Sequence, residues 1–221
     1  EQAEKTELVN GHVWRLCIHS EGAKAISLYY DQFDIPYGGK LFVYNLEQTQ
    51  IAGPFTYQHV HPSGVYATEF IKGDKVILEY FQPNYQTLDA SINLENIAYA
   101  YKSVGGGSDY CQVNANCPEG DDWDDQKKAT CRIQIVNGFS VGLCSGSMIN
   151  NTLNNCTPYV LSADHCFSGG SISASSLNQC IFYFNYLTPT CANSSPGSDA
   201  ITGCSLISNS GGEGSSGDSD F

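Results

Sequence analysis

The sequence predicts an all-β protein, and three observations carry that prediction. The 22 glycines and 14 tyrosines among 221 residues supply turn positions and the aromatic side chains that pleated faces favour. Short β-branched and aromatic runs alternate with turn signals along the chain. No segment keeps a helical period of apolar residues over about three turns. Strands spaced in this way fit an antiparallel sandwich or jelly roll.

The N-terminal half supplies the most regular strand signals. Residues 76–81 are β-branched and aromatic, and they follow the turn at residues 72–74. Pro-Tyr-Gly-Gly at residues 36–39 is another turn signal. We therefore predict a β-sandwich or jelly-roll-like domain over residues 1–102. Its predicted strands are residues 13–18, 25–30, 41–44, 66–71, 75–81 and 92–101.

A glycine-rich segment follows this domain. Residues 103–110 contain three consecutive glycines, which are unfavourable inside a strand or helix. We expect this segment to be a linker to a second domain, residues 111–221. From residue 193 the chain is rich in Ser, Gly and Asn, so residues 208–218 are predicted to form a surface loop. The strands predicted in the second domain are residues 132–136, 142–149, 159–162 and 180–186.

The last of these strands carries aromatic residues at alternate positions, Phe182, Phe184 and Tyr186. Side chains two positions apart lie on the same face of a strand, so the three rings predict one half-buried face. A platform on which sugars or bases stack is the alternative interpretation.

Composition and charge argue against several classes of protein. With 41% hydrophobic and 15% charged residues, the chain has the composition of a folded protein rather than a disordered one. The formal net charge of -13, with only 10 Lys and Arg, argues against nucleic acid, because phosphate binding needs clustered basic side chains. No stretch approaches the roughly 20 apolar residues that a membrane span needs.

The ten cysteines indicate an oxidising compartment. Nine of them follow residue 110, so we expect the second domain to be cross-linked and the first not. Zinc is the competing explanation, but zinc sites need close pairs such as C-x-x-C, and the shortest spacing here is Cys111 to Cys117. We therefore expect disulfides in a secreted, extracellular or periplasmic protein.

Two other groups of side chains are weak candidates for a metal site. His59 and His61 would present two imidazoles on one face of a strand, but no third ligand lies nearby in the sequence. Residues 119–125 supply many carboxylates without the regular ligand spacing of a calcium loop. We expect no cofactor, and a structural calcium ion at residues 119–125 is the alternative hypothesis.

The stretch most informative about chemistry places a histidine directly before a cysteine. An apolar run at residues 159–161 leads into Ser-Ala-Asp-His-Cys, which ends with His165 and Cys166. A Cys-Ser-Gly turn begins at Cys144, 22 residues before Cys166. A bridge between these cysteines would fasten the histidine's loop to the preceding hairpin and stabilise the fold by about 3 kcal/mol. It would also restrict where the imidazole lies, as a general base requires.

These motifs resemble those of the chymotrypsin-like (trypsin-like) serine proteases. That family places its base in Thr-Ala-x-His-Cys, paired upstream with Cys-x-Gly-x-Leu-Ile. The matching segments here are residues 162–166 and the Cys-Ser-Gly-Ser-Met-Ile of residues 144–149. Asn-Asn-Thr at residues 150–152 and Cys-Pro-Glu-Gly at residues 117–120 narrow the resemblance to bacterial lysyl endopeptidases and related secreted proteases. Ser-Asp-Phe at residues 219–221 is similar to the family's acidic triad segment.

The resemblance covers roughly residues 108–221 and implies the first β-barrel of a chymotrypsin-like two-barrel fold. The preceding domain is similar to the β-rich pro-region of some such enzymes, through residues 11–16 and 53–56. The resemblance therefore implies a zymogen in which a β-sandwich precedes the first barrel.

By position, the resemblance implies that His165 is the general base and that Asp220 orients it. The nucleophilic serine and most of the oxyanion hole would come from the second barrel, outside these 221 residues. We therefore expect the N-terminal portion of a secreted serine endopeptidase that acts on polypeptides. It would be inactive alone and would need the C-terminal half of the protease as its partner. The alternatives are a non-catalytic protease homologue and a surface-binding or adhesive secreted protein.

Each assigned residue has a competing interpretation. For His165 it is a structural histidine in a disulfide-bonded loop, and for Asp220 it is a solvated turn residue. Gly-Asp-Ser at residues 217–219 is similar to a nucleophile turn, but Asp220 and Phe221 replace the glycines that such a turn needs. Asp164 is expected to face solvent, because adjacent residues on a strand point to opposite sides.

The resemblance also implies two disulfides within the chain, Cys144–Cys166 and Cys117–Cys191. Cys111 would then pair with a cysteine in the C-terminal half. Cys17 is expected to be a buried small apolar residue. The other cysteines allow three pairings, among which the sequence does not choose: they are Cys131, Cys156, Cys180 and Cys204.

Overall fold

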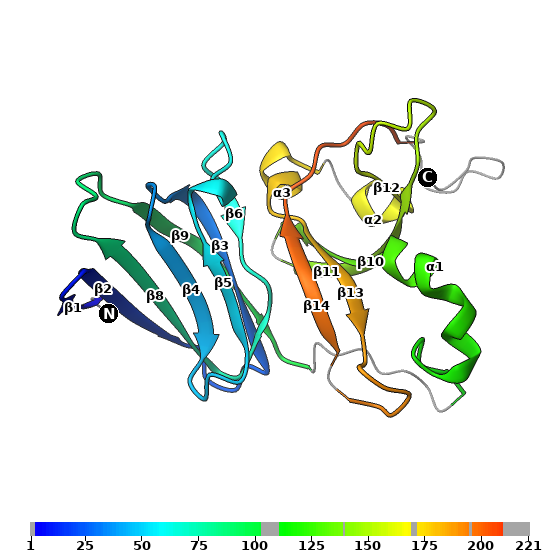
Figure 1. Ribbon diagram of the computed structural model, residues 1–221, viewed down its shortest axis with the longest axis horizontal. Coiled ribbons are helices and arrows are strands. Elements are labelled where there is room, and N and C mark those ends of the chain that lie inside the picture. The colour runs from blue at the N-terminus through cyan, green and yellow to red at the C-terminus, as the bar shows by residue number, and fades with distance from the viewer. Residues whose placement is uncertain (1–2, 103–110, 139, 169–171, 195, 210–221) are drawn as a thin grey trace. The chain divides into compact units, whose positions relative to one another are not determined.

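Figure 1 shows the computed structural model, which describes residues 3–102, 111–138, 140–168, 172–194 and 196–209. The chain divides into two units, Glu1–Val104 and Gly105–Phe221. The predicted linker, residues 103–110, lies outside the described residues. All strand pairings among the described residues are antiparallel, and the chain has the all-β fold that the sequence predicts.

The first unit is a sandwich of two sheets. One sheet consists, in spatial order, of β1 (Glu4–Leu8), β2 (Gly11–His19), β8 (Lys75–Pro83), β4 (Lys40–Asn45) and β5 (Ile51–Phe55). The other sheet is built on β3, which pairs along one edge with β9 and along the other edge with β6 and β7. These four strands are β3 (Ala25–Asp34), β9 (Ser91–Ala100), β6 (Tyr66–Ala67) and β7 (Ile71–Lys72). A 3-10 helix, η1 (Tyr57–His59), connects β5 to β6.

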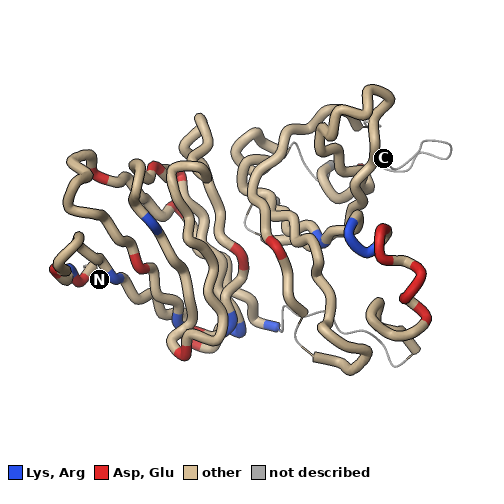
Figure 2. Tube along the Cα trace, in the orientation of Figure 1, with Lys and Arg blue, Asp and Glu red and all other residues tan. Residues whose placement is uncertain are grey.

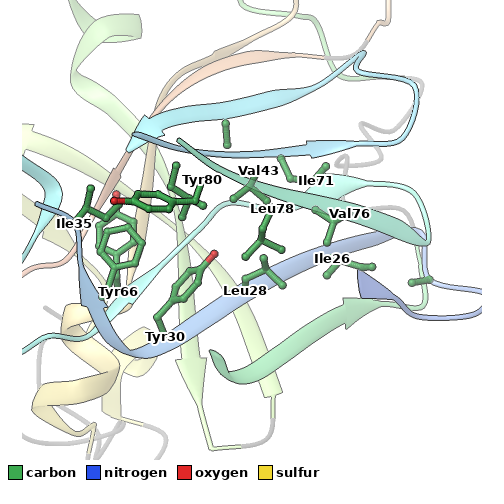
Figure 3. Packing of buried hydrophobic residues seen from close by; sticks show 14 residues of the cluster. Ile26, Leu28, Tyr30, Ile35, Val43, Tyr66, Ile71, Val76, Leu78 and Tyr80 are labelled. Atoms are coloured by element: carbon green, nitrogen blue, oxygen red, sulfur yellow. The ribbon is translucent and has the colours of Figure 1, made fainter. Parts of the chain in front are cut away.

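Alternate residues of strands from the two sheets fill the core of this sandwich. From β3, Ile26, Leu28 and Tyr30 lie against Val76 and Leu78 of β8, as Figure 3 shows. All five side chains are buried, because the two inner faces of the sheets shield them from water. Burial of apolar surface on this scale is the main source of stability for the unit.

The strands β1 and β5, which the sequence analysis did not predict, are the two edges of the larger sheet. An edge strand that is mostly exposed carries no clear apolar alternation. The sequence of β1 is mostly polar, and β5 contains Pro54, which sheets tolerate at their edges. The predicted strand at residues 66–71 is divided in the structure into β6 and β7.

Two predictions about the first unit are wrong. Cys17 is exposed, because Leu16 and Ile18 on either side of it pack against the core and Cys17 points the opposite way. The segment around His59 is the 3-10 helix η1 rather than a strand, and the His59 Nδ1 accepts a hydrogen bond from the Thr56 N–H at 3.0 Å.

The second unit contains one five-stranded sheet that is open. Its spatial order is β12 (Tyr159–Ser162), β11 (Ser140–Ile149), β10 (Thr130–Asn137), β13 (Ile181–Leu187) and β14 (Gly197–Thr202). A closed barrel needs the two outer strands to pair, but β12 and β14 each pair with a single neighbour within the described part of the chain. The described residues therefore form an open sheet, and the first barrel stays a prediction.

Four short helices, none of which was predicted from the sequence, lie among the described residues of this unit: two precede β10 and two lie between β12 and β13. None is longer than six residues, so none leaves a helical period in the sequence. They are η2 (Pro118–Trp123), α1 (Asp124–Ala129), α2 (His165–Ser168) and α3 (Ala174–Asn178).

A residue with left-handed backbone changes the aromatic pattern of β13. Asn185 has a φ of 51°, and the register of β13 on β14 shifts after Phe184. Phe182 and Phe184 pack in the core, whereas the Tyr186 ring lies 4.8 Å from the Arg132 guanidinium on the other side of the sheet. The prediction that the three rings share one face is wrong, because the irregularity at Asn185 interrupts the alternation of a regular strand.

Charged side chains are unevenly distributed over the second unit. Asp and Glu residues line η2 and the start of α1, and Lys127 and Lys128 lie at the end of α1 (Figure 2). The Lys127 ammonium donates to the Asp124 carboxylate at 3.0 Å, which partly neutralises this acidic segment. No helix among the described residues is long and apolar enough to cross a membrane.

Candidate functional site

The candidate site is built on the hairpin of β11 and β12. Gly146 of β11 is opposite Ser162 of β12, and the Ser162 hydroxyl donates to the Ser145 carbonyl oxygen at 2.8 Å. A Cβ atom at Gly146 would lie 2.7 Å from the Val160 Cγ1 and 3.0 Å from the Ile133 Cδ1. The glycine of the Cys-Ser-Gly motif is therefore required for close packing of the two strands.

The end of β12 delivers His165 to the surface. The strand ends at Ser162, and the next residues form the turn that starts α2. In that turn the Cys166 N–H donates to the Ala163 carbonyl at 3.2 Å, and the Phe167 N–H donates to the Asp164 carbonyl at 2.8 Å. His165 is exposed, so a reacting group in solvent has access to its imidazole.

A disulfide ties this loop to the neighbouring strand. Cys166 is bonded to Cys144 of β11, with 6.2 Å between the two Cα atoms. A ring nitrogen of His165 and both sulfur atoms lie within 4.8 Å of one another. Because both sulfurs are in the disulfide, neither is available as a thiolate ligand for a metal ion. The bridge therefore limits where the imidazole of His165 can lie.

Asp164 is 3% exposed, so the prediction that it faces solvent is wrong. The alternation rule for strands does not apply, because Asp164 lies in the turn after β12 and not in the strand itself. Neither of its carboxylate oxygens has a hydrogen-bond partner within the described parts of the chain. The sequence Ala-Asp-His carries no signal of this burial, since aspartate beside a polar turn is usually solvated.

A second disulfide, Cys117–Cys191, joins residues 74 positions apart. It ties the segment before η2 to the connection between β13 and β14. Two asparagine side chains reinforce it: Asn114 Nδ2 donates to the Cys191 carbonyl at 2.8 Å, and Asn116 Nδ2 donates to the Thr188 carbonyl at 2.7 Å. Both pairs that the family resemblance implies are thus disulfides in this structure.

The remaining cysteines of the second unit differ in exposure. Cys111 and Cys156 are exposed, and Cys131 and Cys180 are buried. Burial raises the pKa of the Cys131 thiol, which disfavours the reactive thiolate.

Asp220, which the resemblance implies as the orienting acid, lies outside the described residues, as does Ser219. The carboxylates of residues 119–125 do not form a metal-binding group in the searched, described part of the chain.

The comparison with protein families agrees with the motifs. The family model described as lysyl endopeptidase, C-terminal domain, matches residues 105–221. That match spans the His165 loop, both disulfides and the five strands of the second unit, and it covers more than half of the 221-residue chain. The chain therefore belongs to the lysyl endopeptidase family of proteases.

Proposed function

We propose that the complete protein is a secreted serine endopeptidase in which His165 is the general base. The observation that carries this proposal is an exposed histidine at the start of α2, held beside the Cys144–Cys166 disulfide. A structural histidine is usually buried and packed, whereas a general base must meet the substrate and hold a defined position. Disulfides in the second unit support an oxidising, extracellular compartment.

In the proposed reaction, His165 takes the proton of a serine hydroxyl as that oxygen attacks the peptide carbonyl. The protonated imidazole then gives this proton to the leaving amine, and an acyl-enzyme remains. Water hydrolyses the acyl-enzyme by the same proton transfers in the second half of the cycle. Asp220 would hold the imidazole in the correct tautomer and stabilise its charged form.

The nucleophilic serine is proposed to belong to the C-terminal half of the protease, in the same gene product or on a separate chain. Ser219 does not suit the role, because Asp220 and Phe221 follow it in place of glycines. The 221-residue chain alone is therefore expected to be inactive toward polypeptides. Mixing it with the C-terminal half is expected to restore hydrolysis.

Labelling of the complete protein with a fluorophosphonate tests the proposal, because this reagent reacts with a serine that a neighbouring base activates. The wild type is expected to be labelled and to cleave peptides. A His165→Ala variant is expected to lose labelling and to show kcat at least about 10⁴-fold lower. His61→Ala, which removes an exposed histidine of the first unit, serves as the matched control.

The proposal fails if His165→Ala is labelled and cleaves peptides at the rate of the His61→Ala control. Absence of labelling in a folded, processed wild type would instead support a non-catalytic homologue.

An Asp220→Asn variant is expected to fold and to lower kcat by roughly 10³- to 10⁴-fold. An unchanged kcat would remove Asp220 from the mechanism and leave His165 in place.

A preference for lysine is the finer part of the proposal, and the chain offers one self-processing site. Lys102 is exposed, two residues after the end of β9 and directly before the glycine-rich segment. Cleavage after Lys102 would separate the first unit as a pro-region. Mass spectrometry of active material is expected to show an N-terminus at residue 103. Active protein that stays intact across Lys102 would contradict this part of the proposal.

A surface-binding function is the second candidate, and exposed tyrosines of the first unit favour it. Tyr37 and Tyr57 have ring centroids 5.3 Å apart, and the Tyr85 hydroxyl lies against Gly38 in the same turn. The three rings are 66%, 47% and 69% exposed, and aromatic faces of this kind suit stacking with sugar rings. In sedimentation with insoluble glycans, the wild-type chain and a Tyr99→Ala control are expected in the pellet. A triple variant is expected to stay in solution; it carries Tyr37→Ala, Tyr57→Ala and Tyr85→Ala. Equal amounts of all three proteins in the pellet would exclude this candidate.

A further inference from the structure

Two cysteines outside the known bridges lie at the same end of the hairpin formed by β13 and β14. Cys180 immediately precedes β13, and Cys204 follows the end of β14. The last pair of the ladder is Ile181 with Thr202, and beyond it the Gly203 N–H donates to the Cys180 carbonyl at 2.8 Å. The antiparallel pairing therefore brings together two residues that are 24 positions apart in the sequence (204 − 180).

The last turn of α3 orients both thiols in the same direction. The Cys180 Sγ donates to the Ser176 carbonyl at 3.3 Å, and the Cys204 Sγ donates to the Leu177 carbonyl at 3.6 Å. The Cys204 N–H also donates to the Leu177 carbonyl, at 3.1 Å. Because these two carbonyls belong to consecutive residues, the sulfur atoms that reach them are neighbours in the same apolar cluster.

The two thiols interact directly. The side-chain hydrogen bond between the two thiols lowers the pKa of Cys204, and the same interaction together with burial raises the pKa of Cys180. Cys204 is also the more accessible of the two, since Cys180 is fully buried and Cys204 is partly exposed. The lower-pKa, more accessible sulfur is the one that first attacks an external disulfide.

We propose that Cys180 and Cys204 form a third disulfide of the second unit. Oxidation proceeds by exchange with a small disulfide such as oxidised glutathione. The Cys204 thiolate attacks one sulfur of that reagent, forms a mixed disulfide and expels one thiolate. Cys180 then loses its proton to solvent, attacks the Cys204 sulfur and expels the second thiolate. The protein loses two electrons and two protons, and one external disulfide becomes two thiols.

This bridge would stabilise β14, a strand that few other interactions stabilise. β14 is the edge of the sheet, and five of its six residues are exposed. Such a strand buries little apolar surface, and within the described residues β14 pairs with β13 alone, so it is prone to fray. A bond from Cys204 to Cys180 joins its C-terminal end to the buried start of β13. Of the three pairings that the sequence left open, only one joins Cys180 to Cys204; the proposal keeps that bond and expects Cys131 and Cys156 to remain thiols.

The direct test is peptide mapping of the full chain after expression in an oxidising compartment. The protein is denatured in acid with N-ethylmaleimide, digested without reductant and analysed by mass spectrometry. The expected result is a peptide pair linked through Cys180 and Cys204, with a mass two hydrogen atoms below that of the two thiol peptides. Alkylation at Cys131 and Cys156 is expected in the same sample.

Several results would overturn the proposal: alkylation of both Cys180 and Cys204, a bridge from either one to Cys131 or Cys156, or a persistent glutathione adduct on Cys204. The double variant Cys180→Ser, Cys204→Ser is expected to melt several degrees below the wild type and to exchange the amides of β14 faster. Cys156→Ser, which removes an exposed thiol, is the matched control and is expected to keep the linked peptide. If the double variant does not fold, the peptide map of the wild type decides the question.

Discussion

The two units of the chain are stabilised in different ways. The first unit has an apolar cluster of 14 buried residues and a single cysteine, which is exposed. In the described part of the second unit, the corresponding cluster has five buried residues, two of them cysteines. Two disulfides cross-link that unit, and a third is proposed above. Burial of apolar surface therefore dominates in the first unit, whereas covalent links carry much of the stability of the second.

This difference shows that two β-rich units can be stabilised by different means. A sandwich with two closed inner faces buries enough apolar surface to balance the entropy lost on folding. An open sheet with an exposed outer strand such as β14 buries less, and cross-links compensate by restricting the unfolded chain. The His165 loop lies in the cross-linked unit, where its position depends on a bond rather than on a large core.

Reduction of the disulfides is expected to have the largest effect on this comparison. The loops closed by Cys117–Cys191 and Cys144–Cys166 span 74 and 22 residues, which corresponds to about 4 and about 3 kcal/mol of stabilisation. Dithiothreitol is expected to unfold the second unit at temperatures where the first remains folded. Hydrogen exchange with mass spectrometry reports the two units separately. Equal loss of amide protection in both units would contradict the comparison.

Truncation of a buried ring in the first unit is the converse test. Phe33 is fully buried and stacks on Tyr66 with 4.4 Å between ring centroids. Phe33→Ala is expected to lower the free energy of unfolding of this unit by about 3 to 5 kcal/mol and to leave the second unit unchanged. Chemical denaturation followed by hydrogen exchange measures both effects. Ile51→Ala, on an exposed edge position, is the control and is expected to cost less than about 0.5 kcal/mol.

A smaller effect, confined to the first unit, depends on pH. Burial raises the pKa of Glu69 from its ordinary value of 4.5 to about 7, so the folded unit binds this proton more tightly than the unfolded chain. The stability contributed by the neutral carboxyl is complete below about pH 4.5 and is lost as the pH rises toward about 7. Glu69→Gln keeps the side chain neutral at every pH. It is therefore expected to raise the free energy of unfolding by about 2 kcal/mol at pH 8 and to have little effect at pH 4.

Urea unfolding of the wild type and Glu69→Gln at these two pH values measures the difference. Glu95→Gln, at an exposed position of β9, is the control. A benefit of Glu69→Gln that is the same at both pH values would mean that burial of the charge is not its cause.

The interior strands were the part of the fold that sequence reasoning predicted best. The pattern at residues 75–81 corresponds to β8, and the predicted strand at residues 132–136 lies within β10. Both strands place apolar side chains against a core, so packing and sequence pattern agree. The edge strands β1 and β5 were missed because exposed strands need no apolar alternation, and the short helices were missed because one or two turns show no period.

The candidate site was predicted from a local sequence motif. The predictions that proved wrong concern residues whose position depends on local backbone geometry. The sequence placed His165 beside Cys166 and predicted the Cys144–Cys166 bridge, which the structure confirms; the exposure of the imidazole is what the structure adds. It did not predict that Asp164 is buried, because the chain leaves the strand before that residue. Nor did it predict the position of Tyr186, because the left-handed backbone at Asn185 depends on a bulge that no pattern of apolar residues reveals.

Under the proposed function, the bridge between Cys144 and Cys166 would also have a consequence for the cell that makes this protein. A protease is a hazard inside the cell that synthesises it. Cytoplasmic thiol buffers keep cysteines reduced, so a chain that folded before export would lack the tether on its His165 loop. The disulfide that positions His165 would then form only after export to an oxidising compartment. The redox state of the compartment would keep the protease inactive inside the cell, independent of any inhibitory segment.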